Sequence, residues 1–594
     1  MSSYHAPLAD MRFVLFDLLG AEAQFQRMGF NDATRDVLDA VLDEAARFTE
    51  TVLAPLNGIG DREGCKLDVA TGAVTTPPGF KQAYAQFVDG GWSGLTSPAE
   101  FGGQGMPHAA GVPLKEMIDA ANLAWGNFPL LSHGATEALL HHGEAWQQEA
   151  FLKPLVEGRW TGTMCLTEPH CGTDLGLLKT RAEPQADGSY TITGTKIFIT
   201  AGEHDFTDNI VHLVLARLPD APAGSKGISL FVVPKRRVDR DGNVGDANAV
   251  RCGSLEHKMG IHASATCVLN FDGAEGYLIG HPHKGLAAMF TMMNTARLAV
   301  GLQGLGLSDR ALQNALRYSR ERLQMRAPAG AMFPAKPADP IIVHPDVRRM
   351  LLTCKALVEG GRVMGYDAAL QVDIAHHAPD HAERKQADDL VGFITPIVKA
   401  CLTEWGVECT YNALQCFGGH GYIAEHGMEQ LARDARITTL YEGTTGIQAL
   451  DLLGRKIMQL QGAGLKVFLG QVAAFCDAHD NDASLADFIA PLREKAAQWQ
   501  QLTMAVGKSA ATNPEEIGAA AYDYLMYSGY VVLAYWWARS VAVADASAQS
   551  QAFKDDKRAT ARFYFARILP RTLAHAAAIE SGAAGLPELD VDAA

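Results

Sequence analysis

The chain has 594 residues, of which 48% are hydrophobic and 20% charged, a balance typical of soluble globular proteins with large apolar cores. A formal net charge of −16 argues against nucleic acid as the main partner, because phosphate binding needs a basic surface. The ten cysteines form no CxxC pair, so neither a zinc ribbon nor a dithiol redox motif is indicated, and we expect no metal site.

Neither a signal peptide nor a membrane-spanning segment is indicated by the sequence. The N-terminus lacks the basic start and uninterrupted apolar core of a signal peptide. The apolar run at 523–539 is shorter than the ~20 residues that a spanning helix needs. We therefore expect a buried helix there, no membrane attachment and a cytoplasmic protein.

Hydrophobic periodicity divides the chain into five parts. An N-terminal arm at 1–30 precedes an α domain at 31–160, where apolar residues between Val37 and Phe48 recur at a helical period. Short β-branched runs, at 190–193, 196–200, 210–216, 228–233 and 267–271, predict a β domain at 161–280. The helical period returns in an α-bundle domain at 281–458, with a Pro- and Ala-rich connection at 327–345, and in a further helical domain at 459–594. The fold class is thus mainly α with a central β domain.

Two clusters that could bind a ligand lie in the β region. In 164–174 (MCLTEPHCGTD), the hydroxyls of Thr167 and Thr173 follow a strand and could meet a flat, partly polar ligand, although an ordinary turn explains them equally well. In 196–202 (KIFITAG), the period of two puts Phe198 and Thr200 on one strand face, which suits an aromatic ligand. The alternative is an inward phenylalanine beside a satisfied threonine.

Two further clusters lie in the α-bundle region. The three glycines of 415–422 (QCFGGHGY) permit either a helix C-cap or close backbone contact with a phosphate or adenosine. In 433–446, Glu442 stands between Tyr441 and Gly443. Its carboxylate is either solvated or helix-capping, or it is a general base whose pKa burial would raise.

Together, the four clusters resemble, in order and spacing, the motifs of the acyl-CoA dehydrogenase family over about residues 31–458. The resemblance implies an α / β-barrel / α-bundle fold. The N-terminal arm and the extra C-terminal helical domain are similar to the larger subgroup that includes 3-methylmercaptopropionyl-CoA dehydrogenase.

The resemblance also implies an activity. FAD would be the cofactor, an acyl-CoA thioester the substrate, a trans-2-enoyl-CoA the product and an electron-transfer flavoprotein the acceptor, in a homo-oligomer that is a dimer or a tetramer. The substrate would be 3-methylthiopropanoyl-CoA or a fatty acyl-CoA. Glu442 would be the catalytic base, with its backbone N–H and a ribityl hydroxyl of FAD polarising the thioester carbonyl.

The resemblance implies binding residues as well. It places Thr173, Asn294, Arg297 and Gly443 at the substrate. Arg322 is implied at the FAD pyrophosphate but is equally well explained as a helix-surface charge. The residues implied at FAD are Met164, Leu166, Thr167, Thr173, Phe198, Thr200, Arg322, Gln415, Gly418, Gly419 and Thr444.

Some residues depart from the family pattern, and some alternatives stay open. His170, Cys171 and Leu177 replace small residues, Phe198 stands where many members carry tryptophan, and Asn294 stands where some carry aspartate. The alternatives are an acyl-CoA oxidase that uses oxygen, a flavin-containing DNA-associated protein, and membrane attachment through the C-terminal unit. Glu168 is the rival carboxylate, to which we assign a structural role.

Overall fold

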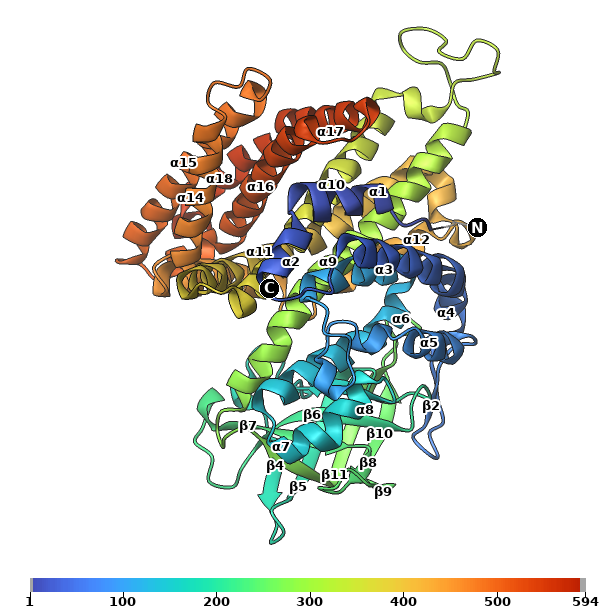
Figure 1. The fold of residues 1–594 in the computed structure, drawn as a ribbon, viewed down its shortest axis with the longest axis vertical. Coiled ribbons are helices and arrows are strands. Elements are labelled where there is room, and N and C mark those ends of the chain that lie inside the picture. The colour runs from blue at the N-terminus through green and yellow to red at the C-terminus, as the bar shows by residue number, and fades with distance from the viewer. Residues whose placement is uncertain (1–3, 588–594) are drawn as a thin grey trace. The chain divides into compact units, whose positions relative to one another are not determined.

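The computed structural model describes residues 4–587 and contains two compact units (Figure 1). The helical unit comprises Met1–Ala46, Pro107–Ala120 and Val300–Ala594, and the sheet unit comprises Arg47–Met106 and Ala121–Ala299. Two long helices, α6 (His108–His142) and α9 (Gly285–Glu321), contribute residues to both units. The five-part division expected from the sequence is finer than this and stays a prediction.

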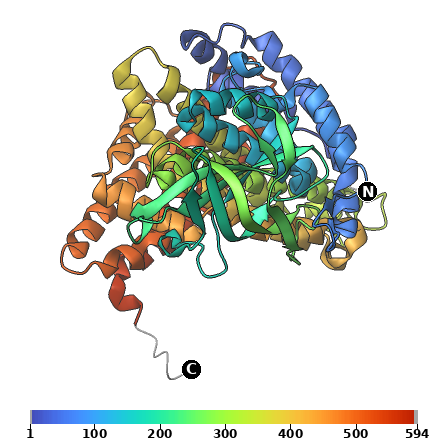
Figure 2. The same ribbon diagram turned by 90° about the horizontal axis from the view of Figure 1, so that it is seen from below.

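The sheet unit is built on seven paired strands among the described residues. The order is β10-β11-β5-β4-β6-β3, and β7 pairs with both β11 and β6, so β11, β5, β4, β6 and β7 form a closed ring (strands in the foreground of Figure 2). A barrel is therefore present, as the family resemblance implied. Its strands are β3 (Trp160–Cys165), β4 (Arg181–Pro184), β5 (Tyr190–Thr200), β6 (Asn209–Arg217), β7 (Ile228–Pro234), β10 (Val250–Leu255) and β11 (Thr266–Ile279).

The strands β6 and β7 explain why this part of the chain forms a sheet. Every residue of β7, and every residue of β6 except Arg217, is buried, which is what strands made mostly of apolar residues specify. Their apolar side chains pack with α6, α8 (Lys153–Val156) and the start of α9 in one core. Two short hairpins, β1 (Lys66–Leu67) with β2 (Val74–Thr75) and β8 (Arg236–Val238) with β9 (Val244–Ala247), were not expected from the sequence. The other helices of this unit are α4 (Asn57–Glu63), α5 (Phe80–Asp89) and α7 (Ala145–Gln147).

The helical unit is organised around an antiparallel pair, α10 (Pro345–His377) and α11 (His381–Cys416). The Pro- and Ala-rich stretch connects α9 to α10, as predicted, apart from a short 3-10 turn at Ile341–Val343. The chain continues through α12 (Met428–Thr438), α13 (Thr445–Leu450), α14 (Ala463–Ala478), α15 (Ala486–Ala510), α16 (Glu515–Ala546), α17 (Gln551–Phe563) and α18 (Thr572–Ser581). Helices α14, α15, α16 and α18 lie side by side (Figure 1).

The N-terminal arm is a packed element rather than an extended one. It folds into α1 (Leu8–Arg12), a π-helical turn at Phe13–Leu18 and α2 (Ala21–Arg27), and α3 (Arg35–Phe48) follows. Met11, Phe13 and Phe25 are fully buried, because this apolar face packs onto the helical unit. Hydrophobic packing therefore fixes a segment that the sequence marked only as an arm.

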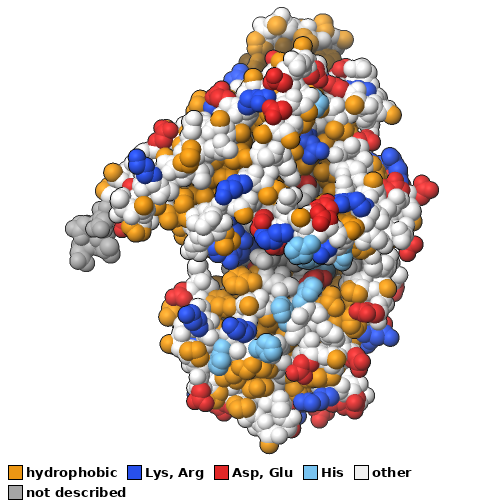
Figure 3. Space-filling view, turned by 60° about the vertical axis from the view of Figure 1, so that its left-hand side comes forward, with side chains coloured by type: hydrophobic (Ala, Val, Ile, Leu, Met, Phe, Trp, Pro, Cys, Tyr) orange, Lys and Arg blue, Asp and Glu red, His pale blue; other side chains and the backbone are white. Residues whose placement is uncertain are grey.

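The apolar run at 523–539 forms the buried middle of α16, as predicted. Within residues 4–587, α11 alone has the length and composition to cross a membrane, and 78% of its most apolar window is buried inside the structure. On the face shown in Figure 3, basic side chains are scattered among acidic, polar and apolar ones.

Candidate active site

The turn after β3 is fixed by a buried ion pair between Glu168 and Lys196. The Glu168 carboxylate lies 2.8 Å from Lys196 Nζ, and it accepts hydrogen bonds from Thr180 Oγ1 (2.6 Å) and from the backbone N–H groups of Lys179 (2.7 Å) and Thr180 (3.0 Å). Burial alone would raise the pKa of Glu168, but Lys196 and these donors lower it to about 2. A carboxylate saturated in this way is a poor base, which agrees with the structural role expected for Glu168.

The ends of β3 and β5 come together at this turn. The backbone N–H of Ile197 donates to the Thr167 carbonyl (2.9 Å), and Lys196 Nζ donates to the Leu166 carbonyl (3.0 Å). Met164 and Thr167 are half-buried and Leu166 is buried. Thr173 is exposed in the turn beyond.

Phe198 has an unusual conformation for a strand residue. Its φ is +59°, its side chain is 59% exposed, and a β-bulge separates the pairings of Lys196 and Ile199 with β11. Without a bulge, Lys196 and Phe198 would share one face of the strand, but Lys196 is buried and Phe198 is exposed. Beyond the bulge the alternation holds, since the exposed Phe198 and the half-buried Thr200 flank the buried Ile199. A left-handed phenylalanine costs roughly 1–2 kcal/mol. Such strain beside an exposed ring indicates a ligand-binding surface, and a planar ring fits it.

On α9, Asn294 is exposed and Arg297 is buried, within the part of that helix that belongs to the sheet unit. Arg322 belongs to the helical unit and lies one residue beyond the end of α9. Its side chain is exposed, and its carbonyl accepts a hydrogen bond from the Ile341 N–H (2.8 Å).

Glu442 lies in the helical unit, on the turn between α12 and α13. Its φ is +56° and that of Gly443 is +93°, so two consecutive residues are left-handed. The Glu442 side chain is half-buried. Glycine is favoured at 443, because φ is positive there and a Cβ would lie 2.7 Å from Gln448 Nε2.

Neighbouring helices brace the two sides of this turn. The Tyr441 hydroxyl donates to the Oε1 of Gln303 on α9, and Thr445 Oγ1 donates to Glu404 Oε1 on α11 (2.5 Å). The Thr444 hydroxyl accepts from the Ile447 N–H (3.4 Å) and so caps α13. The turn at residues 441–445 is therefore held at both ends.

The glycine loop follows α11. Gln415 is exposed on the last turn of that helix, and nothing within 4 Å would meet a Cβ on Gly418 or Gly419. Packing inside the chain therefore does not account for Gly419, which leaves room for a ligand or a second chain. Tyr318 orders the loop from α9, stacking on Phe417 (ring centroids 4.1 Å apart) and bonding His420 Nδ1 (2.8 Å).

The predicted residues thus gather as groups within each unit. Met164, Leu166, Thr167, Phe198 and Thr200 meet at the ends of β3 and β5, and Glu442, Gly443 and Thr444 share one braced turn. In the sheet unit, the exposed aromatic ring and the two threonines beside it suit a flat, partly polar ligand such as a flavin ring. In the helical unit, the open glycine loop leaves space for a phosphate or adenosine group.

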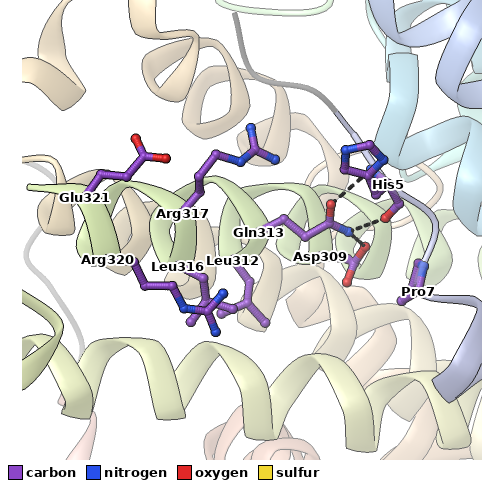
Figure 4. Close-up of a pocket in the computed structure, with 9 residues that line it drawn as sticks. All are labelled: His5, Pro7, Asp309, Leu312, Gln313, Leu316, Arg317, Arg320 and Glu321. Carbon is purple, nitrogen blue, oxygen red and sulfur yellow. Dashed lines mark hydrogen bonds between the residues drawn. The ribbon is translucent and has the colours of Figure 1, made fainter.

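A hollow of about 440 Å³ lies between the C-terminal half of α9 and the start of the chain (Figure 4). There, Gln313 holds the arm by accepting from the His5 N–H (3.1 Å) and donating to the His5 carbonyl (2.8 Å). It contains none of the predicted site residues. Its lining residues are His5, Pro7, Asp309, Leu312, Gln313, Leu316, Arg317, Arg320 and Glu321.

Four family models match successive parts of the chain. They are the acyl-CoA dehydrogenase N-terminal domain (residues 36–159), middle domain (163–274) and C-terminal domain (283–458), and the acetyl-CoA dehydrogenase C-terminal like model (468–590). The family likeness therefore extends beyond residue 458, where the motifs ended.

Relatives match almost the whole chain. A 3-methylmercaptopropionyl-CoA dehydrogenase of Ruegeria pomeroyi is 42% identical over 96% of both chains, and a butyryl-CoA dehydrogenase of Syntrophomonas wolfei is 35% identical over 96% of this chain and 95% of the relative. Among solved structures, Caenorhabditis elegans ACDH-11 in complex with C11-CoA has a TM-score of 0.79 at 20% identity, covering 95% of this chain and 91% of that one. A Bacillus anthracis acyl-CoA dehydrogenase complexed with FAD has a TM-score of 0.75 at 18% identity, covering 94% and 90%. This chain belongs to the acyl-CoA dehydrogenase family, the flavin-dependent oxidoreductases of acyl-CoA thioesters.

Proposed function

We propose that this protein dehydrogenates a saturated acyl-CoA to the trans-2-enoyl-CoA with Glu442 as the base. The observation that carries the proposal is the strained, braced turn at Glu442, since a left-handed carboxylate residue held by surrounding helices marks a functional position. The chemistry that bound FAD supplies is acceptance of the two electrons that leave the acyl chain.

The residues of the chain would handle the proton and the developing charge. An α-proton beside a thioester is a weak acid, so its removal needs both a base and a donor at the thioester oxygen. The Glu442 carboxylate would take the proton, and the backbone N–H of the same residue is the proposed donor. Phe198, Thr167 and Thr200 would hold the flavin ring, and the glycine loop, with Gln415, would hold the adenosine end.

An unbranched acyl group is the proposed substrate. Relatives at 34–42% identity are named for 3-methylmercaptopropionyl-CoA, butyryl-CoA and linear acyl-CoA, which supports 3-methylthiopropanoyl-CoA or a linear fatty acyl-CoA here. A panel of these thioesters, scored by anaerobic bleaching of the flavin absorbance, would rank them. Rapid reoxidation of the reduced flavin by air would favour the oxidase alternative.

Partners and location are proposed on indirect grounds. Three exposed apolar side chains lie in or near the open glycine loop in sequence, which supports a homo-oligomer that completes the site; they are Tyr411 (67%), Tyr422 (83%) and Ile423 (48%). A chain in the solved structure of the electron transferring flavoprotein of Acidaminococcus fermentans matches with a TM-score of 0.57 at 26% identity, covering 70% of this chain and 97% of that one. Together with membership of the family, this match supports an electron-transfer flavoprotein as the acceptor. A cytoplasmic location rests on the sequence alone.

The test is Glu442→Gln, which keeps size and backbone while removing the basic carboxylate. The variant should remain yellow, and an acyl-CoA should still perturb its flavin spectrum, but anaerobic reduction should slow by about 10²–10⁴-fold because general-base catalysis is lost. Glu100→Gln, at an exposed site, is the control. Reduction of Glu442→Gln at the wild-type rate would overturn the assignment, and a colourless wild-type protein that gains no flavin absorbance with FAD would overturn the function.

A further inference from the structure

We infer that Lys399 and Gln448 are positioning residues that fix the Glu442 turn in its active geometry. The inference rests on the proposed function, because it takes Glu442 as the base. Neither residue belonged to the set predicted from the sequence, and neither is expected to touch the reacting atoms.

The turn needs support from outside itself. Glu442 has a left-handed backbone (φ +56°), which costs a residue with a side chain roughly 1–2 kcal/mol. The turn would relax to ordinary dihedrals and carry the carboxylate away unless neighbouring groups held it. Those groups must bind the backbone itself, since the side chain has to remain available for the substrate proton.

Two buried donors bind successive carbonyls of this turn. Gln448 Nε2, from α13, donates to the Glu442 carbonyl (3.1 Å), and Lys399 Nζ, from α11, donates to the Gly443 carbonyl (2.7 Å). Both donor side chains are fully buried. Because the two bonds come from different helices, together they fix the orientation of both peptide planes, whereas one bond would still permit rotation.

The Gln448 side-chain amide uses its Nε2 as a donor to the Glu442 carbonyl. Its Oε1 is buried and has no hydrogen-bond partner among residues 4–587, and its Nε2 faces the Glu442 carbonyl. A flipped amide would put two oxygens against each other, so the donor assignment is fixed. A buried acceptor without a partner, such as Gln448 Oε1, costs about 1–3 kcal/mol of stability. The bond from Nε2 to the Glu442 carbonyl explains why an amide is nevertheless present at this position.

Lys399 binds the turn through a fully buried ammonium. Taking an ammonium out of water costs free energy even where it is paired, and a neutral donor would be a cheaper way to bind a carbonyl for stability alone. Lys399 lies five residues before Glu404 on α11, so that helix binds the turn at both Gly443 and Thr445. Fine placement of the base is worth this cost, since a displacement of about 1 Å can lower a rate by about 10²-fold.

Lys399→Met and Gln448→Met test the inference, because each keeps side-chain length and removes the donor. Anaerobic stopped-flow with a reactive acyl-CoA gives the limiting rate of flavin reduction, and the spectral shift gives the dissociation constant. We expect the limiting rate to fall by about 10–10²-fold with little change in the dissociation constant. Lys399→Arg, which keeps a cationic donor, should recover most of the loss.

Matched controls separate positioning from stability. Lys554→Met removes an ammonium that donates to the Ser547 carbonyl (2.8 Å), and Gln147→Met removes a buried amide that donates to the Leu278 carbonyl (2.8 Å). Both should lower the melting temperature without changing the limiting rate. If Lys399→Met does not fold, Gln448→Met, which introduces no buried charge defect, still decides the matter.

The outcomes distinguish the two levels of the argument. If no acyl-CoA reduces the wild-type flavin, the proposed function is wrong. If the wild type is reduced, Glu442→Gln is not, and both methionine variants of the donors react at the wild-type rate, the positioning role is wrong while the function stands. A fall in rate that Lys399→Arg does not relieve would also overturn the assignment for Lys399.

Discussion

Replacement of Arg362 by methionine should strongly destabilise the helical unit. Its guanidinium is 1% exposed and bonds Glu116 through Nε (3.0 Å) and Nη2 (2.7 Å), Asp309 through Nη2 (3.3 Å), and Asp10 through Nη1. Removal of this cation leaves the carboxylates of Glu116, Asp309 and Asp10 without their shared partner. Because breaking a buried ion pair costs about 3–5 kcal/mol, and Lys557 still pairs with Asp10, we expect a loss near the lower end of that range.

The assay is urea unfolding followed at several pH values. Burial raises the pKa of Asp309 to about 7, although Arg362 opposes the rise. Asp309 is therefore ionised at pH 8, where it needs Arg362, and protonated at pH 5, where it does not. The destabilisation by Arg362→Met should accordingly be larger at pH 8 than at pH 5.

An exposed arginine provides the matched control. Arg27 also ties the N-terminal segment to the bundle, through a bidentate pair with Glu383 (2.5 and 2.7 Å), but at the surface. Arg27→Met should cost no more than about 1 kcal/mol. Equal losses for the two variants, or a loss from Arg362→Met that does not depend on pH, would refute the reasoning about burial.

Two further predictions concern backbone strain and buried histidines. Gly443→Ala should cost roughly 1–2 kcal/mol and slow flavin reduction, because its Cβ would meet Gln448 Nε2; a variant with wild-type unfolding and reduction rate would contradict this. Burial lowers the pKa of His204 and His212 to about 3, below their usual value of 6.5. Both are therefore neutral when folded, and the stability they confer, complete above pH 6.5, should be lost as the pH falls towards 3. His212→Asn, which can keep the bond to Thr163, should flatten that loss in a pH series of unfolding curves; superimposable curves would show that His212 does not carry it.

Periodicity in the sequence predicted most of the elements. The buried strands β6 and β7 and the long helix α9 follow from local patterns, because each pattern directly specifies which side chains are buried. The separate runs at 190–193 and 196–200 were predicted as two strands, but they form the single strand β5, since its glycine and its bulge do not end the pairing. Within the helical domain expected at 459–594, a π-helical turn and a 3-10 turn separate α17 from α18, where Pro570 lies.

The motifs located Glu442 but not the residues that support it. Gln448 lies two positions beyond that cluster and six beyond Glu442, where the first turn of α13 brings its amide back to the Glu442 carbonyl. Lys399 lies 44 positions from Gly443, in a buried helix with no local signal, so only the tertiary fold reveals its contact. The inward turn of Lys196 beside the outward Phe198 was equally hidden, because a bulge cannot be read from a period-two pattern.

The C-terminal helices complete the support of α11. Cys401, two positions from Lys399, donates through Sγ to the Leu525 carbonyl of α16 (3.9 Å), and the rings of Trp405 and Tyr530 lie 5.6 Å apart. Arg571 adds a bidentate pair with Glu408 of α11 (2.7 and 2.8 Å). The helix that binds the Glu442 turn on one side is thus covered by α16 and its neighbours on another. Because a buried helix packed on several sides has few alternative positions, the C-terminal helices restrict the movement of α11, the helix that binds the Glu442 turn through Lys399 and Glu404.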